Sequence, residues 1–192
     1  MAIASKIKQM DFGDNIQLIY LGYAVNCKRV RLPNTLTKPA YLFAFGLEEF
    51  DLTGQIPCSS YSTLSRLERV ILDSSFTTLP SFQNCYSLKE INLDNITVYP
   101  HNSLMECSLV DMNVVFNKDL QSIGNSAFCR THIKSVRFQN SLDALPTVSN
   151  NAFIQCNKLT DIYCPWAEGE VANAPWGATN ATIHYNYTGE VE

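Results

Sequence analysis

One six-residue pattern returns along most of this 192-residue chain and constrains its fold more than any other feature. The pattern is apolar, two mostly polar residues, apolar, any residue, apolar, as in LERVIL at 67–72. Successive copies begin 20, 20, 21, 21, 24 and 26 residues apart, a spacing hard to obtain by chance. The seven first positions are Cys27, Leu47, Leu67, Leu88, Leu109, Ile133 and Leu159.

Each copy predicts a short β-strand, because alternate side chains of an extended chain point to opposite faces. In 70–72 and 91–93 the outer residues are apolar and would face a core. A single strand of this kind cannot bury its apolar face alone, so consecutive copies should stack in parallel about 4.8 Å apart. Seven rungs predict one continuous sheet roughly 29 Å long.

A second element, an aromatic or aliphatic residue followed by a cysteine, precedes several copies. It occurs as Phe82 with Cys85, Leu104 with Cys107, Phe128 with Cys129, and Phe153 with Cys156. Together the two elements resemble the BspA-like class of bacterial leucine-rich repeats over about residues 27–164, most strongly from Leu67 onward. Two departures are visible: Cys129 follows Phe128 directly, where the family leaves two residues between them, and Leu104 stands where phenylalanine is usual. The first two copies lack the element.

The resemblance implies a leucine-rich-repeat solenoid of the α/β type, a right-handed superhelix. A parallel sheet would form one face, and irregular, short helical or 3-10 segments the convex face. We expect an N-terminal cap over 1–26, about seven repeats over 27–164, and a C-terminal cap and tail over 165–192. The residues expected to fill or bend the convex side are Phe82, Phe128, Phe153, Pro80, Pro100, Pro146 and Gly124, with Trp166 and Trp176 in the C-terminal cap.

Composition excludes several classes of protein. A hydrophobic fraction of 46% argues against intrinsic disorder, and a net charge of −4 with 17% charged residues provides no basic surface for nucleic acid. The most apolar stretch, 16–25, is about half the roughly 20 residues that a membrane-spanning helix needs. We recognise no signal peptide. The compartment stays open: cell surface or extracellular if a leader was removed, otherwise cytoplasm or phage particle.

Cysteine and histidine patterns give little support for catalysis or metal binding. None of the seven cysteines forms a C-x-x-C pair, so we expect reduced, buried core residues, with a disulfide between Cys85 and Cys107 as the alternative. Cys129 and His132 have a metal-like spacing, but two ligands do not make a zinc site. His101 and His184 belong to other coils, and no known catalytic motif is present. We predict no enzyme, no metal and no cofactor.

Three Asn-x-Thr sequons, at Asn95, Asn180 and Asn186, would accept glycans only in a eukaryotic secretory setting. We interpret them as ordinary turns.

Outward positions of the predicted strands form two columns on the open sheet face. The first reads Arg29, Glu49, Arg69, Glu90, Asp111, Ser135, Asp161, and the second reads Arg31, Asp51, Ile71, Asn92, Asn113, Arg137, Tyr163. Alternating charges in the first column predict ion pairs between adjacent rungs, from Arg29 through Glu90. The face is either a solvated, self-paired surface or a partner-binding surface. The candidate binding residues are Arg29, Arg31, Glu49, Asp51, Arg69, Glu90, Asn92, Asp111, Asn113, Arg137, Asp161 and Tyr163.

The family resemblance implies a non-catalytic module that binds a protein or glycan, in cell-surface adhesion or host interaction. The alternative is a structural component of a phage or surface assembly, in which the aromatic C-terminal segment docks on a neighbour. Residues 174–185 also resemble the tail that often ends such repeat proteins in gut bacteria and their phages. The partner and the oligomeric state are not defined by the sequence.

Overall fold

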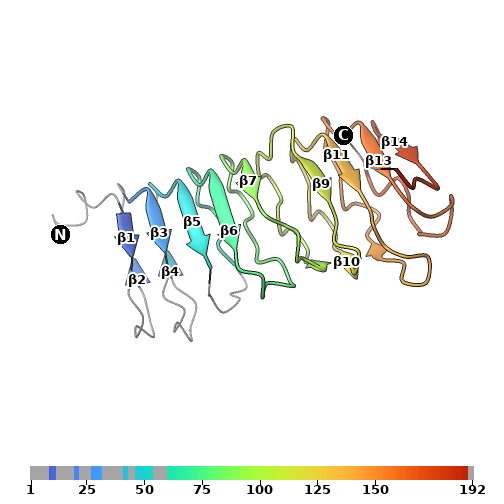
Figure 1. Ribbon diagram of the computed structural model, residues 1–192. Helices are drawn as coiled ribbons and strands as arrows, with labels where there is room; N and C mark the ends of the chain where they lie inside the picture. The colour runs from blue at the N-terminus through green and yellow to red at the C-terminus, as the bar shows by residue number, and fades with distance from the viewer. Residues whose placement is uncertain are drawn as a thin grey trace.

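Short parallel strands follow one another along an elongated coil, with β1 (Gln9–Asp11) and β14 (Thr182–His184) at opposite ends of the array (Figure 1). The computed structural model describes residues 9–11, 20–21, 27–31, 41–42, 46–53 and 60–189. Every strand pairing in these segments is parallel, as the stacking of successive repeats requires. The predicted leucine-rich-repeat solenoid is confirmed.

Two sheets lie in one row along the same face of the coil (Figure 1). The first has five strands: β1 (Gln9–Asp11), β3 (Arg29–Arg31), β5 (Glu49–Leu52), β6 (Arg69–Leu72) and β7 (Glu90–Ile91). The second has four: β9 (Asn113–Val115), β11 (Ser135–Arg137), β13 (Asp161–Tyr163) and β14 (Thr182–His184). Elsewhere on the coil, β8 (Val98–Tyr99), β10 (Ser122–Ile123) and β12 (Thr147–Val148) form a third sheet, and β2 (Tyr20–Leu21) pairs with β4 (Tyr41–Leu42).

One residue of each repeat strand faces the core and stacks on its counterpart in the next rung. Val70 pairs in register with Phe50 and Ile91, and Val136 pairs with Val114 and Ile162. All are buried. The alternation seen in the six-residue pattern therefore predicted the inward face correctly.

The expected single sheet of seven rungs is wrong, because the ladder is interrupted between β7 and β9. Leu88 lies two positions before the first residue of β7, whereas Leu109 lies four positions before the first residue of β9. The two extra residues, Val110 and Asp111, form an exposed turn. The backbone φ is positive at Asp111 (58°) and at the preceding Leu109 (43°). An insertion of this kind disrupts a ladder locally, as a β-bulge does.

The back of the coil is filled as the sequence predicts. Phe82, Phe128 and Phe153 are fully buried, and so is Leu104, which takes the phenylalanine position in its own coil. Their positions define a column of apolar side chains behind the sheets. The convex segments are turns, and no helix occurs in the part of the chain that the structure describes. The short helical segments allowed by the resemblance are thus replaced by turns.

Buried thiols link successive coils on this side. The thiol of Cys107 donates to the carbonyl of Phe82 over 3.2 Å, and Cys156 donates to that of Phe128 over 2.8 Å. Burial raises the pKa of Cys85 to about 12, so this thiol stays protonated. The six cysteines within the described segments are buried and carry free thiols.

The apparent displacement of Cys129 has a simple structural explanation. Thr131 occupies the position that cysteine has in neighbouring coils, and its N–H and hydroxyl both donate to the carbonyl of Phe128. Thr131 is buried and lies 3.4 Å from the sulfur of Cys156. The usual two-residue spacing is therefore kept, with threonine in place of cysteine.

Gly124 lies where two coils approach closely, just after β10. A Cβ built on Gly124 would lie 2.7 Å from the backbone nitrogen of His101 and 3.0 Å from the carbonyl carbon of Pro100. Because both contacts are to backbone, the neighbouring coil would have to shift. We expect Gly124→Ala to lower the free energy of unfolding by about 1–3 kcal/mol, measured by urea denaturation. Gly169→Ala meets no atom within 4 Å and carries only the cost of its positive φ of 89°, a cost that Gly124 does not have. An unchanged free energy of unfolding for Gly124→Ala would contradict the steric explanation.

The ladder continues into both segments that were expected to be caps. β1 pairs with β3 at the N-terminal end, and β14 pairs with β13 at the C-terminal end. Trp166 and Trp176 are fully buried and pack against Phe138, with ring centroids 4.9 and 5.7 Å away. These side chains close the C-terminal end of the core. Of the N-terminal segment 1–26, only 9–11 and 20–21 are described.

Candidate binding face

Charged side chains of the first sheet pair across adjacent rungs. Arg29 contacts Glu49 at 2.7 Å, and Arg69 contacts Glu90 at 3.2 Å. The sequence predicted three successive pairs: Arg29–Glu49, Glu49–Arg69 and Arg69–Glu90. Glu49 and Arg69 are neighbours in the ladder, but the ion pairs are the first and the third. The sequence thus predicted two of the charge contacts correctly.

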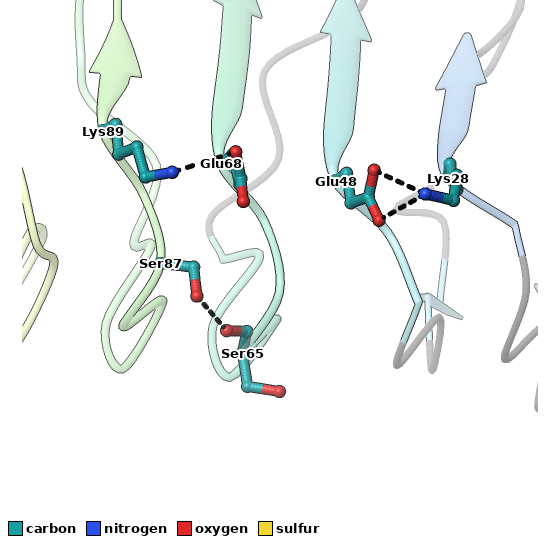
Figure 2. Close-up of polar contacts among 6 residues, drawn as sticks. All are labelled: Lys28, Glu48, Ser65, Glu68, Ser87 and Lys89. Atoms are coloured by element: carbon teal, nitrogen blue, oxygen red, sulfur yellow. Dashed lines mark hydrogen bonds and ion pairs between the residues drawn. The ribbon is translucent and has the colours of Figure 1, made fainter.

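A parallel column of ion pairs, one position upstream, was not foreseen. Lys28 lies 2.9 Å from Glu48, and Lys89 lies 3.1 Å from Glu68 (Figure 2). Their charges do not alternate along the sequence, because two lysines flank two glutamates. The pairing therefore depends on the register of the strands, which the structure supplies. Ser87 adds a hydrogen bond to the carbonyl of Ser65 (Figure 2).

This half of the face is electrically balanced. An open groove is lined by Gln9 and eight charged residues, four basic and four acidic: Lys28, Arg29, Arg69 and Lys89, with Glu48, Glu49, Glu68 and Glu90. Exposed pairs of this kind contribute about 0.2–1 kcal/mol each. A one-residue slip of β7 against β6 would place Arg69 opposite Lys89, or Glu68 opposite Glu90, so the ion pairs between these two strands favour the observed register.

Two further candidate binding residues of this half, Asn92 and Asp51, form hydrogen bonds within the chain, and the side chain of a third, Arg31, is not described. The side-chain amide of Asn92 donates to the carbonyl of Leu72 over 3.0 Å. Its oxygen accepts from the backbone N–H of Leu72 over 2.7 Å. Asp51 accepts from the N–H of Thr53. Arg31 pairs with Asp51 through the backbone, and its side chain lies outside the described set.

Asp111 and Asn113 do not occupy their predicted columns. The strand register places Asn113 opposite Ser135, in the first column, and Val115 opposite Arg137, in the second. Asp111 lies in the exposed turn before the strand, where its N–H donates to the carbonyl of His132. The two-residue insertion shifts the whole strand relative to the sequence pattern. Whether Asp111 or Asn113 binds a partner stays a prediction.

The second sheet brings together three predicted residues, Arg137, Asp161 and Tyr163, with His184 and Tyr187. The rings of Tyr163 and His184 are stacked, 4.6 Å apart with an interplanar angle of 12°. Tyr187 packs on Tyr163 at 4.6 Å, and the guanidinium of Arg137 lies 5.7 Å above the ring of Tyr187. We call these five residues the aromatic cluster. The outer face of the second sheet therefore carries aromatic side chains, whereas that of the first sheet carries ion pairs.

His184 and Tyr187 were missed because β14 lacks the six-residue pattern. Its inward residue Ile183 is flanked by Ala181 and Tyr185, which also pack against the core. This period-two alternation is a weak strand signal that could have placed His184 on the outer face.

Hydrogen bonds fix the carboxylate of Asp161. His184 lies 2.9 Å from one oxygen, and the hydroxyl of Thr160 donates to the other over 2.8 Å. The hydrogen bond from His184, followed by that from Thr160, lowers the pKa of Asp161. Partial burial and the nearby Asp161 charge raise the pKa of Tyr163, so its ring stays neutral.

The Asp161–His184 contact predicts acid sensitivity of the last rung. Because the pKa of Asp161 is lower in the folded chain, its contribution is complete above the unfolded pKa of about 3.9 and is lost as pH falls through the folded value. We expect the loss to be about 0.2–1 kcal/mol, as for exposed pairs. Urea denaturation at pH 6 and pH 2.5 should show a smaller acid-induced loss for Asp161→Asn than for the unmodified chain. Equal losses would contradict the assignment.

The candidate metal pair, Cys129 and His132, does not belong to this cluster, and neither does His101. Cys129 is buried, whereas His132 and His101 are exposed. Within the described residues, no group of three or more His, Cys, Asp or Glu side chains is arranged to hold a metal ion. No helix in this part of the chain is long and apolar enough to cross a membrane. The three sequon asparagines lie in exposed turns.

Comparison with known proteins agrees with the repeat architecture. The sequence profile of the BspA type Leucine rich repeat region matches residues 4–109 and 46–160, in six copies. The chain is also similar to a leucine-rich repeat protein from Bacteroides ovatus whose crystal structure is known, with 14% identity and a TM-score of 0.43. That alignment covers 94% of this chain but 62% of the other. No curated protein matches the sequence significantly. The family profile spans most of the chain, and the protein therefore belongs to the BspA-type leucine-rich repeat family.

Proposed function

We propose that this chain is a non-catalytic binding module that takes a protein or glycan partner on its open sheet face, at a cell surface. The supporting observation is the contrast between the two halves of that face. The eight charged residues that line the groove of the first sheet form ion pairs with one another, whereas the second sheet presents the aromatic cluster. Tyrosine and arginine are the residue types that contribute most binding energy in protein interfaces.

Rigid presentation also favours binding. Four of its five residues lie on β11, β13 and β14, and Tyr187 follows β14. The inward residues Val136 and Ile162 are buried and Ile183 packs against the core, so little conformational entropy is lost when a partner docks. Repeat arrays commonly use such extended surfaces for recognition.

The test is a binding screen of the immobilised chain against extracellular proteins and a glycan array. We expect saturable binding to members of one class, weakened at least tenfold by the double variant Tyr163→Ser, Tyr187→Ser. The matched control, Glu48→Gln with Glu68→Gln on the first sheet, should bind as the unmodified chain does. Absence of saturable binding to either class would overturn the proposal.

The alternative role in a phage or surface assembly relied on the aromatic C-terminal segment as the docking group. Trp166 and Trp176 are fully buried in this chain's own core. They therefore do not supply an exposed docking group, and in this segment the docking role falls to Tyr187 of the aromatic cluster.

A further inference from the structure

We propose that Arg137 binds an acidic side chain of an extended peptide segment in the partner protein, with Val115, Tyr163 and Tyr187 contacting the apolar residues beside it. This inference rests on the proposed binding function and assigns the kind of partner and the place where it docks.

Charge distribution singles out Arg137 on the sheet face. Four basic residues of the first sheet, Lys28, Arg29, Arg69 and Lys89, each have a carboxylate within 4 Å. Arg137 has none among the residues that the structure describes, and its guanidinium instead lies over the ring of Tyr187. Asp161, the acidic residue on the next strand, is already bound by His184 and Thr160.

A carboxylate is the ligand that this arrangement fits best. The planar guanidinium presents paired N–H donors that match both oxygens of a carboxylate, and it does so while one face lies on an aromatic ring. Lys134, one strand position upstream of Ser135, adds a second positive charge at the same strand. These two cations outnumber the one nearby carboxylate, that of Asp161, so the local charge at β11 favours an acidic ligand, whereas the ion-paired groove of the first sheet is balanced.

Apolar neighbours favour a peptide. Val115 stands opposite Arg137 in the ladder, and its side chain is 43% exposed, although it belongs to a strand that otherwise buries its apolar residue. Tyr163 stands opposite Arg137 on the other side, with Tyr187 packed on it. Adjacent rungs are about 4.8 Å apart, and an extended peptide rises about 3.3 Å per residue. A peptide that crosses the rungs would place an apolar residue one or two positions from the acidic one.

The experiment selects a displayed library of random twelve-residue peptides on the immobilised full chain. We expect enriched peptides to carry Asp or Glu within two positions of an apolar residue. Their affinity should fall at least tenfold on Arg137→Gln, fall less on Arg137→Lys, and weaken with added salt. The control Arg69→Gln removes a basic residue from the paired half and should leave affinity unchanged. Near-ultraviolet circular dichroism of each variant verifies that the cluster stays folded.

Three other outcomes would overturn the proposed peptide site at Arg137. Enriched peptides without an acidic residue, or peptides whose affinity Arg137→Gln leaves unchanged, would reject this site while the chain still binds ligands. A failure to enrich any peptide, together with binding in the glycan arm of the functional screen, would retain the binding function and reject a peptide partner. Failure of both experiments would reject the binding function itself.

Discussion

Replacing Phe116 by alanine should lower the free energy of unfolding by about 3–5 kcal/mol, one of the largest losses expected for a single substitution in this chain. Phe116 is fully buried directly after β9. Its ring lies 4.9 Å from that of Phe138 and 5.3 Å from that of Tyr99, and it also contacts Phe128 and Phe153. Alanine would leave a cavity among aromatic rings that cannot all collapse into it.

Two control variants separate cavity formation from a general effect on this strand. Val115→Ala, at the exposed neighbouring position, should change stability by less than about 0.5 kcal/mol. Phe116→Leu retains most of the volume and should cost less than the alanine variant. Urea denaturation measures all three. A loss below about 1 kcal/mol for Phe116→Ala would mean that the ring contacts of Phe116 contribute little to the free energy of unfolding.

Phe116 also shows where the sequence pattern misleads. Leu109, Met112 and Val114 match the apolar template, so the strand was placed two residues too early. The structure instead buries Val114 in β9 and Phe116 directly after it, and leaves Met112 partly buried. Because Leu109 is buried as well, the pattern alone does not distinguish an insertion from a regular repeat. Register is set by pairing with β11, a contact that is distant in sequence.

Elsewhere, the repeat made the sequence unusually informative. The inward residues at β3, β5, β6, β11 and β13 follow from side-chain alternation alone, since each rung repeats the same local geometry. What could not be predicted depends on contacts between coils. Thr131 in the place of cysteine and the Lys28–Glu48 pair both become visible only when one coil is stacked on the next.

The candidate site was predicted in part for the same reason. Arg137, Asp161 and Tyr163 belong to regular repeats, so their outward orientation followed from the pattern. His184 and Tyr187 belong to the irregular end of the array, where the chain turns back after β14. There the N–H of Tyr187 donates to the carbonyl of Cys164, which brings its ring onto β13. The C-terminal segment therefore both closes the core and completes the exposed cluster.

Replacing Trp176 by alanine should expose the C-terminal end of the core and cost about 3–5 kcal/mol. The side chain is fully buried, and its indole N–H donates to the carbonyl of Ala172 over 2.8 Å. Its own carbonyl accepts from the N–H of Phe153 over 2.9 Å, which joins the closing segment to the last Phe–Cys coil. Trp176→Phe keeps much of the apolar contact and should cost less.

The loss in Trp176→Ala should be local at first, because each rung of a repeat array contacts only its neighbours. Native-state hydrogen exchange should therefore show reduced protection at β14 and β13, while β6 keeps its protection under mild conditions. Asn180→Ala, an exposed change in the same closing segment, provides the matched control. Equal loss of protection at β6 and β14 would show instead that the array unfolds as one cooperative unit. In that case the closing tryptophan would stabilise the first sheet and the aromatic cluster together.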